Sequence, residues 1–349
     1  MTGIFPAGFD PDGASDSEGL FGLPIDATTA KVQVIPVPFE ATASYRRGTA
    51  AAPSAVVEAS WQVDLHDSHF GDVWREGIAM LPERDEIARA NRAACRLAEP
   101  VIAAGGGAEG EFHSSCAQVD ELMEGVHTIV RDETRGIMER GAIPAVFGGD
   151  HSVPLGAIRE VAAKVPELGI LHVDAHADLR TAYEGFRYSH ASIFDNVLRD
   201  CEIRSLVQVG IRDLSGAERA LGVSDRRIRQ HLWSETAEQT SEGRPWMAIC
   251  NDWVSELPES IWISLDVDGL DPGLCPNTGT PVPGGFSWDQ LMALLLSVYR
   301  AGKCVVGFDI SEASGEPWDS IVAARLLYKL SGLSIRSNQA STTSRQNQR

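Results

Sequence analysis

The chain has 349 residues, of which 43% are hydrophobic and 23% are charged, so it contains enough apolar material for an ordinary globular core. The formal net charge of -19 disfavours binding to nucleic acid or anionic membranes and favours cationic substrates and divalent metals. The six cysteines form no CxxC pair, and the first residues lack the basic and apolar regions of a secretory signal peptide. We therefore expect a cytoplasmic protein that binds neither nucleic acid nor a membrane.

The chain divides into three parts. Residues 1–31 are rich in Gly, Asp, Ser and Pro and are expected to form an irregular arm. Residues 32–333 alternate short apolar runs with segments of helical periodicity, and residues 334–349 are expected to be a disordered polar tail. Strands are predicted at 32–37, 142–147, 169–173, 206–211, 261–267 and 304–310, and helices at 119–138, 154–165, 189–198, 288–299 and 319–330. A Gly/Ala/Pro-rich stretch at 47–55 is expected to lead into a further helix. This alternation predicts an α/β fold with a parallel sheet.

Polar residues follow four of these apolar runs directly. In open parallel sheets, ligands bind in the crevice beyond the carboxyl ends of the strands. Four separate strands therefore deliver carboxylates and imidazoles to one rim. The residues in question are His151 after the run at 142–147, Asp174, His176 and Asp178 after 169–173, Asp266 and Asp268 at the end of 261–267, and Glu312 after 304–310.

The spacing of these residues predicts a metal site. Side chains at i and i+2 of an extended chain point the same way, so Asp174, His176 and Asp178 can face one centre, as can Asp266 and Asp268. Carboxylates this close repel one another unless cations neutralise them. With His151, the six donors are too many for one tetrahedral zinc and suit two octahedral cations that share carboxylates. Mn²⁺ fits best, with Ni²⁺, Co²⁺ and Fe²⁺ as alternatives.

Each cluster also has a simpler interpretation when it is taken alone. A lone Asp-x-Asp pair, such as Asp266 and Asp268, is usually a loop or a helix cap, and three clusters at strand ends argue against that interpretation. By strand alternation His172 shares the side of Asp174 and His176, so it could support the metal ligands, but we favour a packed core histidine. The other histidines are expected to be structural or solvated: His66, His69, His113, His127 and His231.

Three motifs resemble the signatures of the ureohydrolase family, which contains arginases, agmatinases, guanidinobutyrases, proclavaminate amidinohydrolases and formimidoylglutamases. They are Gly-Gly-Asp-His-Ser at 148–152, Asp-Ala-His-Ala-Asp at 174–178 and Ser-Leu-Asp-Val-Asp-Gly-Leu-Asp-Pro at 264–272. The resemblance extends from about Val32 to Leu333, and further matching segments lie at 44–49, 279–285 and 307–312. These motifs are specific for the family and much less so for the substrate.

The resemblance implies an arginase-like, three-layer α/β/α sandwich with a mainly parallel sheet and two manganese-type ions per chain. The more buried ion would be held by His151, Asp174, Asp178 and Asp266, and the other by Asp174, His176, Asp266 and Asp268. Asp174 and Asp266 would bridge the two ions. Water activated between them would attack the guanidinium carbon, and the products would be urea and an amine.

The resemblance also assigns catalytic residues and an assembly. His190 matches the histidine that carries a proton to the leaving amine, and its neutral-range pKa suits that task. Glu312 matches the carboxylate that pairs with the guanidinium through two parallel hydrogen bonds. Asp178 counts with His190 and Glu312 as catalytic, in addition to its role as a metal ligand. A homotrimer or homohexamer is expected.

The substrate is the least determined feature. Residues 179–188 resemble agmatinase-type enzymes, which predicts hydrolysis of agmatine, a small cation, to putrescine and urea. Alternatives are 4-guanidinobutyrate, another guanidino acid, or free guanidine. A formimidoylglutamase would need a basic residue for a carboxylate tail, for which Arg180 or Arg187 would serve. The N-terminal arm and Trp318 depart from short agmatinases, and the arm could cover the pocket of a neighbouring subunit.

Two other classes of protein remain as alternatives. A deacylase of the histone-deacetylase type would act on acylated polyamines with one zinc, but the paired aspartate clusters and Glu312 favour two metals and a guanidinium. A metal-binding or regulatory protein without activity would be favoured by the loss of His190 or of a metal ligand. None of these residues is lost.

Overall fold

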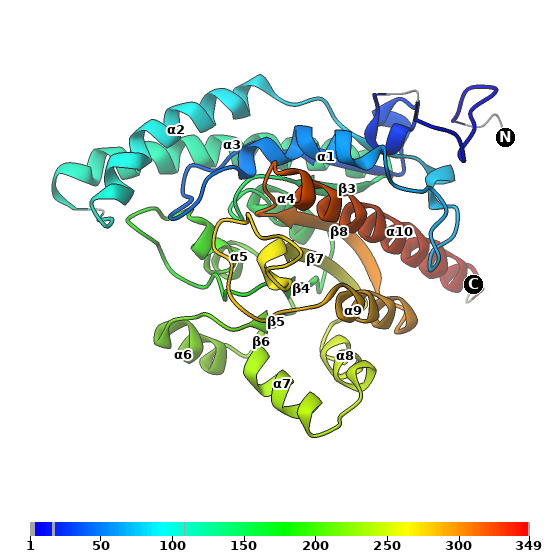
Figure 1. Ribbon diagram of the computed structural model, residues 1–349. Helices are drawn as coiled ribbons and strands as arrows, with labels where there is room; N and C mark the ends of the chain where they lie inside the picture. The colour runs from blue at the N-terminus through cyan, green and yellow to red at the C-terminus, as the bar shows by residue number, and fades with distance from the viewer. Residues whose placement is uncertain (1–3, 16–17, 108, 348–349) are drawn as a thin grey trace.

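The protein is built on one parallel sheet (Figure 1). The computed structural model describes residues 4–15, 18–107 and 109–347, and side chains as far as Ser341. Within them, eight strands lie in the order β2-β1-β3-β8-β7-β4-β5-β6, and all neighbours run parallel. The strands are β1 (Val32–Pro36), β2 (Ile78–Met80), β3 (Ile143–Phe147), β4 (Gly169–Val173), β5 (Ser205–Ile211), β6 (Ile228–Leu232), β7 (Ser260–Asp266) and β8 (Cys304–Ser311).

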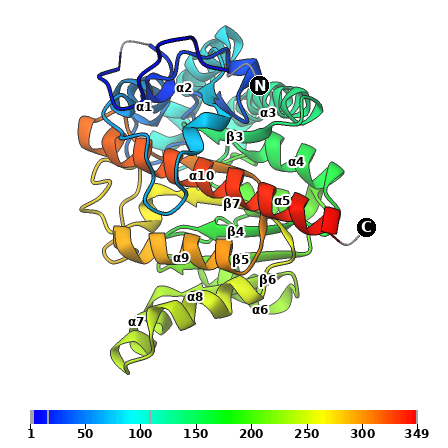
Figure 2. The ribbon, with the colours of Figure 1, turned by 90° about the vertical axis from the view of Figure 1, so that its right-hand side faces the viewer.

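Helices cover both faces of the sheet and complete three layers. One apolar core packs strands against α1 (Ala52–Ser60), α8 (Trp246–Ser255), α9 (Trp288–Arg300) and α10 (Pro317–Asn347), and the last three cross the sheet in Figure 2. The other core packs strands against α2 (Asp85–Ala103), α3 (His113–Glu139), α4 (Leu155–Lys164) and α5 (Ile193–Asp200). Consecutive strand residues alternate between the cores, as Val34 and Ile35 do. The remaining helices, α6 (Gly216–Ser224) and α7 (Trp233–Ser241), flank β6.

The predicted fold class is confirmed, and each predicted strand and helix is present. The prediction omitted β2, β6 and the helices α1, α2, α6, α7 and α8, apart from a suggested helix after the Gly/Ala/Pro-rich stretch at 47–55. Strand β6 lies at the edge of the sheet, and its residues after Ile228 are half-buried or exposed. It therefore lacks the continuous apolar run that marks a central parallel strand.

Both ends of the chain pack more closely than expected. Within the arm, Leu20 and Phe21 are buried, and Phe5 and Phe9 pack against Trp74 of the same chain. The described arm is therefore partly a packed element rather than wholly irregular. No helix among the described residues is long and apolar enough to cross a membrane.

The expectation of a disordered polar tail is wrong for the described residues after Leu333, because they continue α10. Ser334 is fully buried, and its hydroxyl donates to the Leu330 carbonyl at 2.8 Å. The Ser337 hydroxyl accepts from the Val305 backbone N–H at 3.1 Å, which ties the helix to β8. Small side chains with satisfied hydroxyls pack closely, so the polar composition did not indicate exposure.

Candidate active site

The polar clusters predicted from the sequence meet at the carboxyl edge of the sheet. The strands that precede them, β3, β8, β7 and β4, are consecutive neighbours in the sheet. Parallel strands end at the same edge, so residues far apart in the chain are brought together there. The geometry therefore joins four segments into one site.

The first donor cluster centres on the buried imidazole of His151, which follows β3. Its Nδ1 atom lies 3.1 Å from Asp174 Oδ2, 3.0 Å from Asp178 Oδ2 and 3.5 Å from Asp266 Oδ2. All three carboxylates are buried. One nitrogen and three carboxylate oxygens thus converge from the ends of three strands.

The other side of the His151 ring determines which nitrogen faces these oxygens. The Ser264 hydroxyl donates to Asp309 at 2.7 Å, so it accepts from His151 Nε2 at 2.9 Å. Trp262 Nε1 also donates to Asp309, at 2.9 Å. Neutral His151 therefore carries its hydrogen on Nε2 and turns an unprotonated Nδ1 toward the carboxylates. Burial opposes a charge on His151, but Asp174 and Asp178 raise its pKa well above the ordinary value, so without a metal a proton also occupies Nδ1. A divalent cation would take the place of that proton, so this donor set fits a metal ion.

The second donor cluster shares Asp174 with the first. His176 Nδ1 lies 2.9 Å from Asp268 Oδ2 and 3.6 Å from Asp174 Oδ1. The two oxygens of Asp174 therefore face different imidazoles, since Oδ2 faces His151. A carboxylate placed in this way can bridge two cations.

The electrostatics of the clusters also favour bound cations. Burial, and then the neighbouring Asp174, raises the pKa of Asp178 to about 7. Burial, and then Asp268, raises the pKa of Asp266 well above its ordinary value. Burial opposes a charge on His176, but Asp268 raises the pKa of that imidazole to about 12. The metal-free cluster therefore retains protons that divalent cations would displace.

His172 is buried in the core, as favoured, and it also supports the site, which was the alternative. The ring is buried, but its Nε2 atom lies 2.7 Å from Asp174 Oδ2. The Gln208 amide nitrogen lies 3.0 Å from His172 Nδ1 and therefore donates to it, which leaves the hydrogen on Nε2. Strand alternation places His172 and Asp174 on one face of the chain, and the imidazole orients that carboxylate.

Glu312 lies beside the first cluster in a constrained backbone conformation. The residue is buried and has a φ of 63°, in the left-handed region that side chains other than glycine rarely adopt. Its own N–H donates to the Gly149 carbonyl at 2.9 Å. Burial, and then Asp150, raises the pKa of Glu312 well above its ordinary value. A bound cation would therefore stabilise its charged form.

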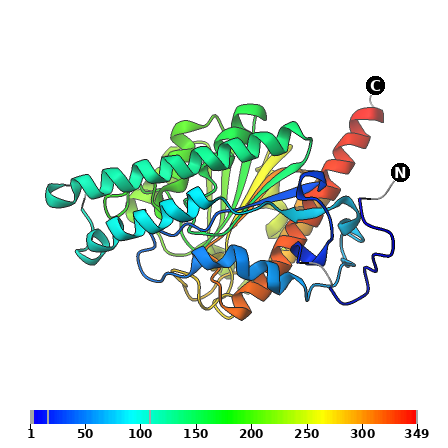
Figure 3. The ribbon, with the colours of Figure 1, turned by 90° about the horizontal axis from the view of Figure 1, so that it is seen from above.

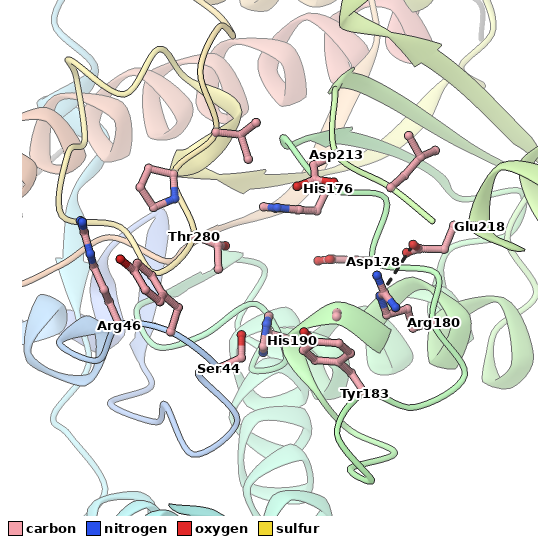
Figure 4. Close-up of a pocket in the computed structure, with 15 residues that line it drawn as sticks. Ser44, Arg46, His176, Asp178, Arg180, Tyr183, His190, Asp213, Glu218 and Thr280 are labelled. Carbon is pink, nitrogen blue, oxygen red and sulfur yellow. Dashed lines mark ion pairs between the residues drawn. The ribbon is translucent and has the colours of Figure 1, made fainter. Parts of the chain in front are cut away.

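A cavity of about 510 Å³ opens onto both clusters (Figure 4). His176 and His190 point into it from opposite sides. Burial lowers the pKa of His190, so a neutral imidazole faces the cavity. The lining residues with polar side chains include Arg46, His176, Asp178, Arg180, Tyr183, His190, Asp213 and Glu218.

Of the two candidate arginines, the cavity contains Arg180 and not Arg187. The Arg180 Nε atom lies 3.7 Å from Glu218 Oε2, and its guanidinium carbon lies 4.9 Å from the centre of the Tyr183 ring. Arg187 instead packs over Tyr188, at 5.0 Å from that ring centre. A basic group therefore stands in the cavity, held by one carboxylate and one aromatic ring.

The loop that carries Tyr183 is held by the α2–α3 helical hairpin, which projects away from the sheet in Figure 3. Asp120 on α3 accepts from the backbone N–H of Arg187 at 3.0 Å. At the tip of the hairpin, a Cβ on Gly106 would lie 2.6 Å from Glu184 Cα, so a side chain there would displace the loop. The loop and the hairpin are therefore in tight contact.

Two residues of the candidate site, which follow β5, were not predicted. The Arg212 guanidinium donates to the carbonyls of Asp268, Val282 and Leu270 at 2.6, 2.9 and 3.1 Å, and so joins the loops that form the site. Asp213, next to it, is an exposed carboxylate in the cavity wall. Their position directly after a strand was the signal that could have identified them.

Comparisons with known proteins match most of the chain. A model described as "Arginase family" matches residues 30–331. An N(1)-aminopropylagmatine ureohydrolase of Thermus thermophilus is 33% identical over 306 residues, which is 87% of this chain and 90% of the relative. The agmatinase of Pyrococcus horikoshii is 29% identical, with 89% and 95% covered. The crystal structure of agmatine ureohydrolase of Thermoplasma volcanium superposes with a TM-score of 0.69 at 25% identity, with 95% and 97% covered.

Proposed function

The chain belongs to the arginase family and is an agmatinase-like, metal-dependent ureohydrolase, and we propose that two divalent cations occupy the two donor clusters that share Asp174. The proposal rests on the placement of that carboxylate, whose Oδ2 atom faces His151 and whose Oδ1 atom faces His176. Mn²⁺ is the expected metal and Ni²⁺ the alternative, because carboxylates and imidazoles suit both. The remaining ligands are Asp178, Asp266 and Asp268.

The residues of the chain bind and orient the substrate around this centre. When bound, the cations neutralise the carboxylates and lower the pKa of water enough for attack near neutral pH. Glu312 accepts two hydrogen bonds from the substrate guanidinium and fixes its carbon. His190 takes up a proton at the atom that faces the cavity and passes it to the departing nitrogen. The products are urea and an amine.

Agmatine is the proposed substrate, since it carries a guanidinium at one end and an ammonium at the other. Asp213 supplies an exposed carboxylate in the cavity wall, where it would accept hydrogen bonds from the distal ammonium. The net charge of -19 favours the approach of a dication over that of a guanidino acid.

A urea-release assay over a panel of guanidino compounds tests this proposal. Protein reconstituted separately with Mn²⁺ and with Ni²⁺ is offered agmatine, 4-guanidinobutyrate, arginine and free guanidine. We expect agmatine to have the highest kcat/KM. If neither the Mn²⁺-loaded nor the Ni²⁺-loaded protein releases urea from any of these compounds, the proposed activity is refuted.

The position of Arg180 favours a second candidate, a guanidino acid such as 4-guanidinobutyrate. Its guanidinium lines the cavity, with the Nε atom 3.7 Å from Glu218 Oε2. The Glu218 carboxylate also accepts from the backbone N–H groups of Leu179 and Ser215, at 3.1 and 2.8 Å. A substrate carboxylate would therefore find a cationic partner in Arg180. Faster hydrolysis of 4-guanidinobutyrate than of agmatine would select this candidate.

The assembly is a separate part of the proposal. A homotrimer or homohexamer is expected from the family resemblance. Light scattering at micromolar concentration should therefore give a multiple of the chain mass of 37.6 kDa. A mass equal to that of one chain would contradict it.

A further inference from the structure

Two buried residues, Thr42 and Asp150, connect to His190 through a line of hydrogen-bond contacts. The Thr42 hydroxyl lies 3.0 Å from Asp150 Oδ2 and 3.3 Å from His190 Nδ1. The backbone N–H of His190 donates to the same hydroxyl at 3.2 Å. The other oxygen of Asp150 accepts from the N–H of Ser152 at 3.1 Å. The line therefore runs from a fixed carboxylate, through a hydroxyl, to the imidazole.

The direction of these hydrogen bonds follows from their chemistry. A hydroxyl has one hydrogen, and a carboxylate can only accept, so the Thr42 hydrogen goes to Asp150. The contact of Thr42 with Asp150 is shorter than its contact with His190, and its acceptor is charged. A hydrogen bond donated to Asp150 is therefore stronger than one donated to His190. The lone pairs of the Thr42 oxygen then face His190. One lone pair accepts the backbone N–H, and the other accepts from the ring only if the hydrogen is on Nδ1.

We propose that Thr42 and Asp150 are positioning residues that hold the hydrogen of neutral His190 on Nδ1 and leave Nε2 unprotonated toward the cavity. This inference rests on the proposed role of His190 as proton carrier. In this tautomer His190 gains a proton at Nε2 from the attacking water and returns it to the leaving nitrogen. The ring ends neutral with its hydrogen on Nδ1, so the next turnover begins from the same state.

Ser189 provides the rival arrangement. Its hydroxyl lies 3.4 Å from His190 Nδ1 and accepts from the backbone N–H of Ala191 at 3.3 Å. If Ser189 donated its hydrogen to Nδ1, the tautomer would be the opposite one, with the hydrogen on Nε2. The two hydroxyls lie at nearly equal distances from Nδ1, 3.3 Å for Thr42 and 3.4 Å for Ser189, so the variants of each must be compared. Ser189→Ala is therefore the matched control, because it removes a neighbouring hydroxyl of the same kind.

The first experiment reads the tautomer directly. Solid-state NMR of sedimented protein with ¹⁵N-labelled histidine distinguishes protonated from unprotonated ring nitrogens, and His190→Ala identifies the signals of His190. In the parent and in Ser189→Ala we expect the hydrogen on Nδ1. In Thr42→Val we expect the Nδ1–H population to fall, and in Thr42→Ser we expect it to return. A parent protein with the hydrogen on Nε2 would overturn the proposal.

The second experiment measures urea release from agmatine by Mn²⁺-loaded protein, with metal content and melting temperature as checks on folding. Thr42→Val should lower kcat by about tenfold or more with KM changed by less than about threefold, because the imidazole is no longer held in the productive tautomer. Thr42→Ser should recover most of the lost kcat, and Ser189→Ala should match the parent.

The outcomes separate this inference from the proposed function. If Thr42→Val turns over like the parent while His190→Ala is slow, His190 carries the proton but the positioning role is wrong. If His190→Ala itself turns over like the parent, the proposed role of His190 is wrong. Thr42 and Asp150 then have no catalytic role through His190 either. If Thr42→Val loses its metal or does not fold, Thr42→Ser and the tautomer of the parent still decide the question.

Discussion

The Oε1 atom of Glu312 accepts a hydrogen bond from the backbone N–H of His151 at 3.0 Å. The residue proposed to bind the guanidinium is thereby fixed to the loop that presents a metal ligand. Glu312→Gln keeps an oxygen for this hydrogen bond but removes the charge. We expect kcat/KM to fall by about tenfold or more, because a charged hydrogen bond contributes about 1.5–3 kcal/mol.

Metal analysis of the Glu312→Gln protein should still give two ions per chain. Glu316→Gln, which changes an exposed carboxylate four residues further on, is the control and should be fully active. Loss of metal from Glu312→Gln would show that the carboxylate acts on the metal centre rather than on the substrate.

We expect Asp213 to favour agmatine and Arg180 to favour 4-guanidinobutyrate. Asp213→Asn should lower kcat/KM for agmatine by about fivefold to tenfold and leave 4-guanidinobutyrate almost unaffected, because only the first has a distal ammonium. Arg180→Met should show the opposite pattern. Steady-state kinetics of both variants on both substrates check this. Equal losses on the two substrates would mean that neither residue contacts the tail.

Asp174→Asn should lose both ions, because Asp174 contributes an oxygen to each donor cluster. His190→Ala should keep both ions and lose turnover by about 10²–10⁴-fold. Metal analysis after reconstitution measures the first effect and urea release the second. One ion retained in Asp174→Asn would show that the clusters bind independently.

Removing the metals should lower the melting temperature of the parent, because a ligand bound only to the folded state stabilises it by about 2.7 kcal/mol at 100 times its Kd. Thermal unfolding with and without a chelator measures this. The same melting temperature in both conditions would show that the clusters fold equally well without cations.

Gly210 should tolerate no side chain. Its φ is 94°, and a Cβ would lie 2.7 Å from the Asp174 carbonyl oxygen. Gly210→Ala should therefore destabilise the protein by about 2 kcal/mol or more and weaken metal binding. Gly216→Ala is the matched control, because a Cβ there meets no atom within 4 Å. Denaturant unfolding and metal titration of both variants measure the difference.

Asp120 should make stability depend on pH. Burial raises the pKa of this carboxyl from 3.8 to about 6. Between these values the unfolded chain loses the proton and the folded protein keeps it, so stability falls as pH rises. The melting temperature of Asp120→Asn minus that of the parent should therefore increase from pH 4 to pH 6. Above pH 6 this difference should stay constant. A gain that is constant from pH 4 to pH 8 would contradict the raised pKa.

The sequence predicted most of the central sheet because central parallel strands are apolar on both faces. It also predicted that the six proposed metal ligands would meet at one edge of the sheet, because alternation and strand ends restrict where Asp174 and Asp266 can point. It did not predict the support around them. The hydrogen bond from His151 to Ser264 joins the loop after β3 to β7, and the contact of Gln208 with His172 joins β5 to β4. Register across a sheet is not visible in the sequence of one strand.

The α2–α3 hairpin shapes one wall of the cavity from outside the sheet. Its tip presses on the loop that carries Tyr183, whereas the proposed metal ligands lie closer to the strand ends and outside that contact. A change in the length of the hairpin is expected to shift the cavity wall around Tyr183, while the proposed ligands at the ends of the other strands keep their places. New substrates could thus be acquired by insertion or deletion in a surface element, and chimaeras that exchange only this hairpin are a direct route to altered specificity.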